Sequence, residues 1–487
     1  MRVKTFGIVL RGGVVAALMA TGAFAQSDGE VITKQYDDGS VYEGTFKDGL
    51  QSGTGTYTLP NGYQYTGEWV AGEIKGKGTA RFPNGSIYEG DFAAGKPHGT
   101  GKITYPDGGT FEGDWVDGQM TGKGVAHYAD GSVYTGDFVN AVHQGEGVMQ
   151  SPGGAKYEGS WVAGVKEGQG KITYADGAVY QGGLKAGARV GKGTLTMPEG
   201  LTYVGDWADG QINGVGKLTQ PNGDVYEGPF VNGERQGKGL MRYATGDTYD
   251  GAFVADKRQG AGVFKGADGY SYTGDWVDGR MEGQGSLTYP DGSVYVGAFK
   301  ADQADGLGKI TYPDGTGYDG EWKAGAIEGK GKASYAGGAT YEGQLKDGLA
   351  HGLGAMFYPD GYKYDGAWVA GKRQGKGTAT YADGSVYVGD FVNGLREGIG
   401  ELTMPDGFKY TGSWAAGEID GLGLATYANG DTYEGEFVKG KRQGQGVMRY
   451  AGGQESAGTW TKGVLSGPAE PLAPADGAAA PAPAVEN

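Results

Sequence analysis

Residues 65–78 read Tyr-Thr-Gly-Glu-Trp-Val-Ala-Gly-Glu-Ile-Lys-Gly-Lys-Gly, and this stretch decides the fold because it returns along most of the chain. Its leading aromatic residue recurs every 23 residues from Tyr42 to Tyr433, eighteen times, without insertion or deletion. A nineteenth copy at Ser456 keeps the spacing and lacks the aromatic ring. A fixed period of this length is the sequence signature of a repeat array, in which each repeat contacts mainly its neighbours.

Each repeat predicts a β-hairpin. With the leading aromatic residue as position 1, positions 1, 3 and 5 hold an aromatic residue, glycine and Trp, Phe or Leu, and they alternate with polar positions 2 and 4. This alternation is typical of a strand, and a second strand is predicted over positions 13–18. The connection between them, as in Pro106-Asp107-Gly108, predicts a type I turn followed by a G1 bulge. Positions 6–12 are expected to form a longer loop.

Stacked hairpins of this kind predict an all-β fold, an elongated single-layer antiparallel sheet of about 19 repeats over residues 36–467. One face is expected to carry the aromatic rings, and the other to pair acidic strands with strands that carry Lys and Thr. At position 5, Trp alternates with Phe or Leu, except that Phe230 and Phe253 follow one another. The sequence therefore predicts two blocks of paired hairpins, with a seam and any bend near residues 226–256.

The two ends of the chain differ from the array. Residues 1–25 have a basic start and an apolar run over residues 14–25 that ends in Ala-Phe-Ala, the pattern of a cleavable secretory signal peptide. The run is shorter than the roughly 20 residues that a membrane-spanning helix needs. We therefore expect cleavage after Ala25 and a periplasmic or extracellular location. Residues 26–35 are read as a short lead, and the Ala- and Pro-rich residues 468–487 as a disordered tail.

The composition argues against several classes of function. The chain has no cysteine, which excludes disulfides and thiolate metal sites, and its formal net charge of −16 makes nucleic acid an unfavourable partner. The four histidines fall at positions 11, 17, 10 and 11 of four separate repeats, and nothing pairs them as metal ligands, so neither a metal nor a cofactor is expected. An enzyme would need different side chains converging on one pocket, and the uniform repeat offers none. We expect no catalytic activity from these residues.

The motif Tyr-x-Gly-x-Trp-x-x-Gly-x-x-x-Gly-x-Gly of residues 65–78 closely resembles the MORN (membrane occupation and recognition nexus) repeat. The resemblance covers nearly the whole chain after residue 25. It implies an array of β-hairpins that acts as a scaffold or a membrane-proximal adaptor, often as a dimer. It also implies phospholipid as a ligand that has repeatedly been proposed for the family. In MORN proteins that are enzymes, catalysis belongs to an attached domain.

Two sets of side chains are candidate contact sites. Rings along an open sheet face are either the core of the repeat or a groove for sugars, peptides or lipid tails. Arginine recurs at position 10, inside the expected loop, where it is either solvated or faces anionic groups. The candidate groove residues are Tyr65, Trp69, Trp115, Trp161, Trp207, Trp276, Trp322, Trp368 and Trp414. The candidate anion-contacting loop edge consists of Arg189, Arg235, Arg258, Arg373, Arg396 and Arg442.

The sequence supports two functions. The first is an exported, non-enzymatic scaffold or adaptor that presents a long aromatic groove to protein partners, a second copy of the chain included, through many weak equivalent contacts. The alternative is an envelope module that binds a glycan or lipid surface.

Overall fold

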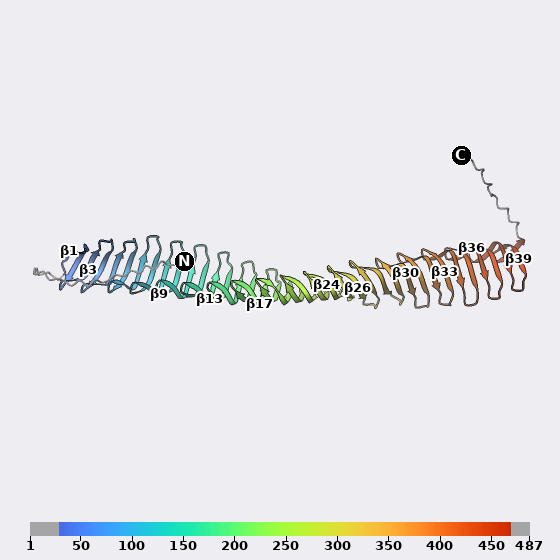
Figure 1. Cartoon of the computed structure of the whole chain (residues 1–487), viewed down its shortest axis with the longest axis horizontal. Coiled ribbons are helices and arrows are strands. Elements are labelled where there is room, and N and C mark those ends of the chain that lie inside the picture. Colours follow the sequence, from blue (N-terminus) through green and yellow to red (C-terminus); the bar gives the residue numbers. More distant parts are fainter. Residues whose placement is uncertain (1–28, 469–487) are drawn as a thin grey trace, which may run out of the picture. The chain divides into compact units, whose positions relative to one another are not determined.

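The structure of the protein is a computed structural model that describes residues 29–468 (Figure 1). The predicted signal peptide and nearly all of the predicted tail lie outside the described residues. The chain divides into two compact units after Asp256, here called the N-terminal unit and the C-terminal unit. Residues 29–468 form strands and turns throughout, so the predicted all-β hairpin array is confirmed. No helix in this range is long and apolar enough to cross a bilayer.

The strands of the N-terminal unit follow one another in chain order. They are β1 (Val31–Gln35), β2 (Val41–Lys47), β3 (Leu50–Thr58), β4 (Gln64–Val70), β5 (Glu73–Arg81), β6 (Ile87–Ala93), β7 (Lys96–Thr104), β8 (Thr110–Val116), β9 (Gln119–His127), β10 (Val133–Val139), β11 (Val142–Gln150), β12 (Lys156–Val162), β13 (Val165–Thr173), β14 (Val179–Lys185), β15 (Ala188–Thr196), β16 (Thr202–Ala208), β17 (Gln211–Thr219), β18 (Val225–Val231), β19 (Glu234–Arg235), β20 (Gly237–Arg242) and β21 (Thr248–Val254).

The C-terminal unit continues the pattern. Its strands are β22 (Lys257–Lys265), β23 (Ser271–Val277), β24 (Arg280–Thr288), β25 (Val294–Lys300), β26 (Gln303–Thr311), β27 (Gly317–Lys323), β28 (Ala326–Ser334), β29 (Thr340–Lys346), β30 (Leu349–Phe357), β31 (Lys363–Val369), β32 (Lys372–Thr380), β33 (Val386–Val392), β34 (Leu395–Thr403), β35 (Lys409–Ala415), β36 (Glu418–Thr426), β37 (Thr432–Val438), β38 (Lys441–Arg449), β39 (Glu455–Thr461) and β40 (Val464–Pro468).

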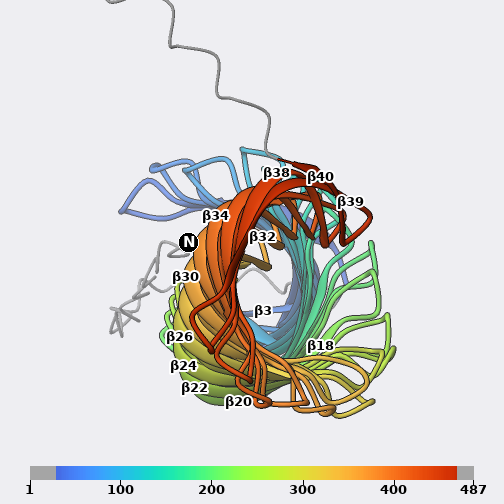
Figure 2. The same ribbon diagram turned by 90° about the vertical axis from the view of Figure 1, so that its right-hand side faces the viewer.

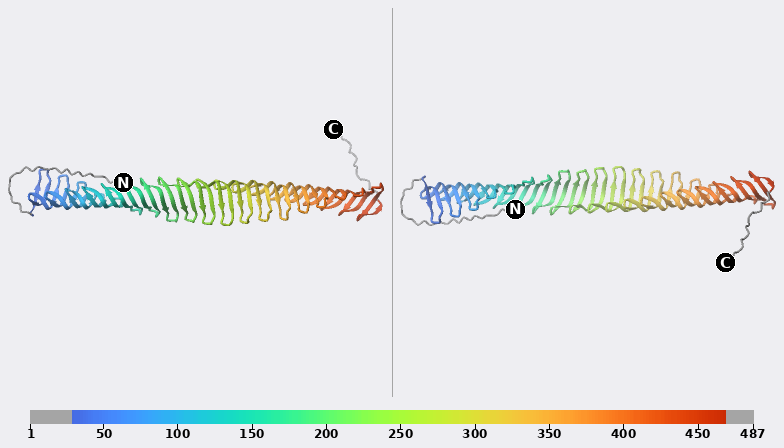
Figure 3. Two further views of the ribbon diagram at one scale, coloured as in Figure 1. Left: turned by 90° about the horizontal axis from the view of Figure 1, so that it is seen from below. Right: turned by 90° about the horizontal axis from the view of Figure 1, so that it is seen from above.

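Within each unit, strands that are neighbours in sequence pair antiparallel and lie side by side (Figures 1 and 3). Each repeat gives one strand of seven residues, which ends at position 6, and one of nine residues, which spans positions 9–17. The ribbon of each unit is a single layer of strands (Figure 2). A single-layer sheet can bury large side chains only against its own backbone and against neighbouring repeats.

The predicted connection at positions 19–21 is confirmed. In the first repeat, the Leu59 amide donates to the Tyr63 carbonyl at 2.8 Å, and the Gly62 amide donates back to the Leu59 carbonyl at 3.0 Å. Gly62 has φ +91°, the left-handed conformation that a G1 bulge requires. The Asn61 side chain accepts a hydrogen bond from the Tyr63 amide at 3.0 Å, which explains the preference for Asp or Asn at position 20.

The expected loop over positions 6–12 is wrong. The turn consists of two residues, as in Ala71 (φ +49°) and Gly72 (φ +88°), and the next strand begins directly at Glu73. Two consecutive residues with positive φ define a type I′ turn, the tight hairpin turn whose twist suits antiparallel strands. Position 12 is a second left-handed glycine, Gly76 (φ +98°), beside a shift in strand register. The residue at position 10 therefore lies in a strand, opposite position 5, as the Trp69–Ile74 pair shows.

The spacing of aromatic residue and glycine has a steric cause. A Cβ atom on Gly67 or Gly78 would lie 2.4 Å from the Tyr65 side chain, so the tyrosine ring rests directly on these two glycines. The Tyr65 hydroxyl donates to the Glu68 carbonyl at 3.0 Å. Gly67 pairs with Gly78 across the hairpin and with Gly55 in the preceding repeat, so the glycines form a continuous line across the strands. The rings at position 1 are at most 3% exposed as a result.

One irregularity falls inside the predicted seam. Where other repeats have a nine-residue strand, the chain has β19 and β20, interrupted at Gln236. The residue opposite is Pro229, whose carbonyl accepts from the Gln236 amide at 3.0 Å but which has no N–H to donate in return. The missing donor explains the interrupted pairing. The division between the two units also follows this stretch, after Asp256. The bend itself stays a prediction.

Candidate functional surfaces

The rings at positions 1 and 5 form an aromatic ladder along one face of each unit. The Tyr88 ring contacts Phe92 of its own repeat at a centroid distance of 5.1 Å and Trp115 of the next repeat at 5.0 Å, both edge-to-face. Equivalent contacts recur through both units, for example between Tyr387 and Trp414 at 5.0 Å. Edge-to-face packing at this distance is favourable because the positive ring edge meets the negative ring face.

The predicted groove residues all belong to this ladder and are largely buried. Tyr65 is fully buried, and seven of the eight named tryptophans are only 3–5% exposed; Trp322 is half-buried. Each indole N–H already donates to the position-14 carbonyl of the preceding repeat, as Trp115 does to Gly101 at 3.0 Å. The rings therefore form the core of the repeat. Their contact with a partner stays a prediction. The other buried tryptophans of the set are Trp69, Trp161, Trp207, Trp276, Trp368 and Trp414.

The placement of the six arginines on a loop edge is wrong, because the two-residue turn puts position 10 in a strand. Each guanidinium lies over the position-5 ring of the next repeat, with Arg258 4.0 Å from the centroid of Trp276 and Arg396 4.2 Å from that of Trp414. Each also donates to the position-8 carbonyl of the next repeat, at 2.6–2.9 Å. Cation–π contact and carbonyl capping cover the ladder. Anion binding by these side chains stays a prediction. The other four are Arg189, Arg235, Arg373 and Arg442.

One repeat has a histidine in place of this arginine. The His143 ring stacks on Tyr134 at a centroid distance of 3.8 Å and lies edge-on to Trp161 at 5.0 Å. Its Nε2 atom is 2.6 Å from the Tyr128 hydroxyl. Burial lowers the pKa of His143 from 6.5 to about 4, because the charged imidazolium loses water in this aromatic surrounding. The imidazole is thus held neutral at physiological pH.

The free energy of unfolding of this repeat is expected to decrease as the pH falls from about 6.5 to about 4. In that window the unfolded chain binds a proton at His143 that the folded chain does not, so unfolding becomes easier. Hydrogen exchange of β11 and β12, measured across the window, should show the loss of protection. Methionine occupies the same position in two other repeats, as Met120 and Met281, so His143→Met is the matched variant. It should lose less protection from exchange over the same pH range. Equal pH dependence in both proteins would contradict this assignment.

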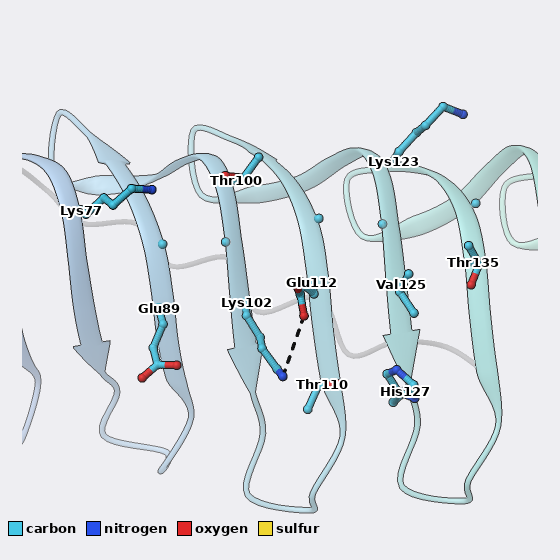
Figure 4. A pocket seen from close by; sticks show the side chains of 15 residues that line it. Lys77, Glu89, Thr100, Lys102, Thr110, Glu112, Lys123, Val125, His127 and Thr135 are labelled. Carbon is cyan, nitrogen blue, oxygen red and sulfur yellow. Dashed lines mark ion pairs between the residues drawn. The ribbon is translucent and has the colours of Figure 1, made fainter.

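The opposite face of the sheet is polar. In the N-terminal unit it carries an open groove of about 900 Å³, whose lining includes Gly101 and Gly113 of the glycine line. Lys102 and Glu112 lie in this groove (Figure 4). The lysines that line it form cross-strand ion pairs, with Lys77 2.8 Å from Asp91. Such exposed pairs contribute little to stability, because water and salt screen them. The predicted pairing of acidic with Lys- and Thr-bearing strands is confirmed here. The other two ion pairs are Lys102–Glu112 at 3.8 Å and Lys123–Asp137 at 2.9 Å.

The same polar face differs in the C-terminal unit. At position 13 the N-terminal unit has mostly polar residues such as Lys77 and one exposed valine, Val215, whereas the C-terminal unit has four large aliphatic side chains that are 60–70% exposed, besides Lys330 and Lys376. We call these four residues the aliphatic row. Sequence reasoning missed it because position 13 was interpreted as mostly polar; the change from Lys to Leu or Ile at a fixed position was the available signal. The aliphatic row consists of Leu307, Leu353, Ile399 and Leu422.

A second open groove lies on the aromatic face, at the edge formed by the type I turns. Its volume is about 700 Å³, and Met404, Phe408, Tyr427 and Met448 line it together with Arg442. The rings of Phe408 and Tyr427 come from consecutive turns and are 5.6 Å apart. We call this site the turn groove. Within residues 29–468, no group of three His, Asp or Glu side chains is arranged to hold a metal ion.

The MORN repeat family model matches eighteen consecutive repeats of this chain, from residues 42–62 to residues 433–455. These matches span most of the sequence, and the chain belongs to the MORN-repeat family. No curated protein matches it.

Three solved structures resemble parts of the chain. The TCP10 domain of Danio rerio CPAP, solved with a STIL peptide, is 16% identical over 55% of this chain and 93% of that chain, with a TM-score of 0.17. The SAS-4 TCP domain of Drosophila melanogaster, solved with a proline-rich motif of Ana2, is 15% identical over 44% and 97%, with a TM-score of 0.18. A streptogramin B lyase is 12% identical over 61% and 92%, with a TM-score of 0.11.

Proposed function

We propose that this MORN-repeat protein is an exported, non-enzymatic scaffold that binds protein partners through its polar face. The observation that carries the proposal is the aliphatic row, four large side chains that are 60–70% exposed on the polar face, where Val296, Val388 and Leu424 are exposed as well. Exposed aliphatic side chains that share one register position mark protein contact surfaces, because association removes them from water. The polar side chains around them supply a hydrogen-bonding rim.

Repetition gives such a surface its strength. Leu307, Leu353 and Ile399 are two repeats apart, about 19 Å at four strands, and Leu422 follows Ile399 after one repeat, about 9.6 Å. Once a partner has bound one repeat, each additional contact increases its affinity without a second loss of translational and rotational entropy. Many weak contacts along the sheet therefore add up to stable binding. A second copy of the chain is one such partner in this proposal, and light scattering would then give twice the mass of the chain at micromolar concentration.

The alternative, an envelope module for glycans or lipids, draws less support from the side chains. Sugars stack on exposed ring faces, and the candidate tryptophans are buried, with their indole N–H groups already used in hydrogen bonds.

The proposal of export rests on the signal-peptide pattern of residues 1–25. Amino-terminal sequencing of the secreted or periplasmic fraction tests it directly, and the expected first residue is Gln26.

The partner-binding proposal is tested by crosslinking mass spectrometry in the native cell. Replacing Leu307, Leu353 and Ile399 together with serine is expected to reduce partner crosslinks about tenfold and to leave folding intact, because substitutions at exposed positions change stability by only about 0.5 kcal/mol. The matched control replaces Lys77 and Lys123, the same register position in the N-terminal unit, and should leave most crosslinks in place. Crosslinks that survive the triple substitution would remove the aliphatic row from the proposal.

A further inference from the structure

The hairpin array begins and ends inside the same strand of the repeat. Strand β1 (Val31–Gln35) holds positions 13–17, and strand β40 (Val464–Pro468) holds positions 9–13. Each is therefore one part of the nine-residue strand that other repeats have, and the two parts meet at position 13. The sequence agrees, because Glu30 and Ala469 replace the glycines that stand at positions 12 and 14 of every complete repeat.

Both end strands leave a sheet edge without a partner strand inside residues 29–468. Strand β1 pairs with β2, and β40 pairs with β39. Because β40 ends at Pro468, opposite Gly458, residues Glu455–Ala457 of β39 also lack a neighbouring strand on that side. Such an edge exposes backbone N–H and C=O groups that can pair with another strand. Beside it, Leu465 is 41% exposed, whereas Met120, at the same position of an internal repeat, is 9% exposed.

A second copy of the chain fits these two edges in register. Inside the array, the later part of each nine-residue strand pairs with the preceding seven-residue strand, with position 15 opposite position 2, as in β4 and β5. Extending this register lays residues 33–35 of one copy along residues 455–457 of another, with Thr33 opposite Ala457. Strand β1 then supplies the part of the strand that β40 lacks. The hydrogen-bonded ladder of one copy would thus continue into the next.

Two unusual side chains face one another in this arrangement. Position 1 is aromatic in the eighteen complete repeats but is Ser456 in the last one, and position 16 is apolar or aromatic in all of them but is Lys34 in β1. Positions 1 and 16 are cross-strand neighbours inside the array, as Tyr65 and Ala80 are. A short serine opposite a long lysine keeps the pairing of one small with one large side chain. The two departures from the repeat therefore complement each other across the contact.

The charge of Lys34 leaves this edge open. Lysine on an edge strand commonly prevents pairing with another chain. Here the ammonium nitrogen is 5.1 Å from the ring centroid of Tyr36 and 5.9 Å from that of Phe46, which belongs to β2 on the inner side of β1. The charge is thus directed away from the free edge, into a cation–π contact of the kind that the arginines at position 10 make.

We propose that copies of this chain associate head to tail, with β1 of one copy completing the strand that β40 begins in another. The contact joins two different edges, so every assembly keeps one free edge of each kind and can add further copies. The proposal is independent of export and of the aliphatic row. Loss or survival of partner crosslinks in the triple-serine variant therefore does not affect it.

Disulfide trapping between two variants of the full chain tests this register, and the absence of native cysteines keeps the readout clear. One variant carries a cysteine in β1 and the other a cysteine in β39, so every mixed disulfide joins two copies. The matched pairs are Thr33→Cys with Ala457→Cys, and Gln35→Cys with Glu455→Cys. The crossed pairs, Thr33→Cys with Glu455→Cys and Gln35→Cys with Ala457→Cys, use the same four exposed positions and serve as controls.

Directly opposite residues of antiparallel strands have Cα atoms about 4.5–5.5 Å apart, within reach of a disulfide, whereas diagonal neighbours are about 7–8 Å apart. The matched pairs should therefore form mixed disulfides about tenfold faster than the crossed pairs, as measured by mass spectrometry of the linked peptides. Equal rates for matched and crossed pairs, or no mixed disulfide from either, would overturn the proposal. Disulfides of one variant with itself at the rate of the matched pairs would also overturn it, because like edges would then meet.

Discussion

Replacing Gly101 with alanine is expected to lower the free energy of unfolding of its repeat by about 3 kcal/mol, the upper range for overpacking a buried site. The new Cβ atom would lie 2.2 Å from the Tyr88 hydroxyl oxygen and 2.4 Å from Cζ, so the ring must lift off the sheet. Lifting the ring breaks its hydrogen bond to the Asp91 carbonyl, 3.0 Å long, and its edge-to-face contact with Trp115.

Hydrogen exchange of β6, β7 and β8 measures this effect where it occurs, since repeats unfold partly independently of one another. Gly153→Ala is the matched control: this glycine has open space around it and no positive φ. It is expected to leave exchange nearly unchanged. Similar protection in the two variants would show that the tyrosine does not rest on the glycine line.

Replacing Trp115 with alanine is expected to lower the free energy of unfolding by about 4 kcal/mol, within the range measured for large aromatic residues in protein cores. The indole is 5% exposed, lies edge-to-face against Tyr88 and Phe111, and donates to the Gly101 carbonyl at 3.0 Å. Its removal leaves a cavity between two repeats, so both should lose protection from exchange.

Trp115→Phe is the informative comparison. Phenylalanine occupies the same position in the adjacent repeats, at Phe92 and Phe138, where it makes equivalent contacts to the neighbouring rings. The phenylalanine variant should therefore lose only about 1 kcal/mol, mainly the indole hydrogen bond. Urea denaturation of the two variants separates the outcomes. A phenylalanine variant as unstable as the alanine variant would mean that alternate repeats are not interchangeable.

The hairpin, the type I turn and the division into two faces could be predicted from the sequence. The strands and their faces follow from the alternation of apolar and polar positions, and the turn follows from residues that strongly prefer one backbone conformation. Asn61 and Gly62 fix the turn almost alone, since the asparagine accepts the Tyr63 amide and the glycine takes the left-handed conformation. The regular period then places every equivalent side chain on the same face.

The two-residue turn was missed for an equally specific reason. Type I′ turns favour Asn-Gly and Asp-Gly, but many repeats have alanine at the first turn position, as in Ala71, and alanine rarely adopts positive φ. The asparagine or aspartate that stands there in other repeats, such as Asp48 and Asn140, was the available signal. Because the turn was interpreted as a loop, the arginines at position 10 were predicted to lie in that loop. Their cation–π contacts with the aromatic ladder were therefore not predicted.

The pairing of each strand with its chain neighbours alone has a mechanical consequence. A force applied to the polypeptide chain at the outermost strand of one unit, and directed across the strands, loads the hydrogen bonds of that strand before any other. Hydrogen bonds loaded in this direction break one after another, whereas the bonds between strands that are sheared along their length bear the load together. Each unit should therefore lengthen under low tension in steps of one 23-residue repeat and close again when released, so that the array would behave as an extensible spring.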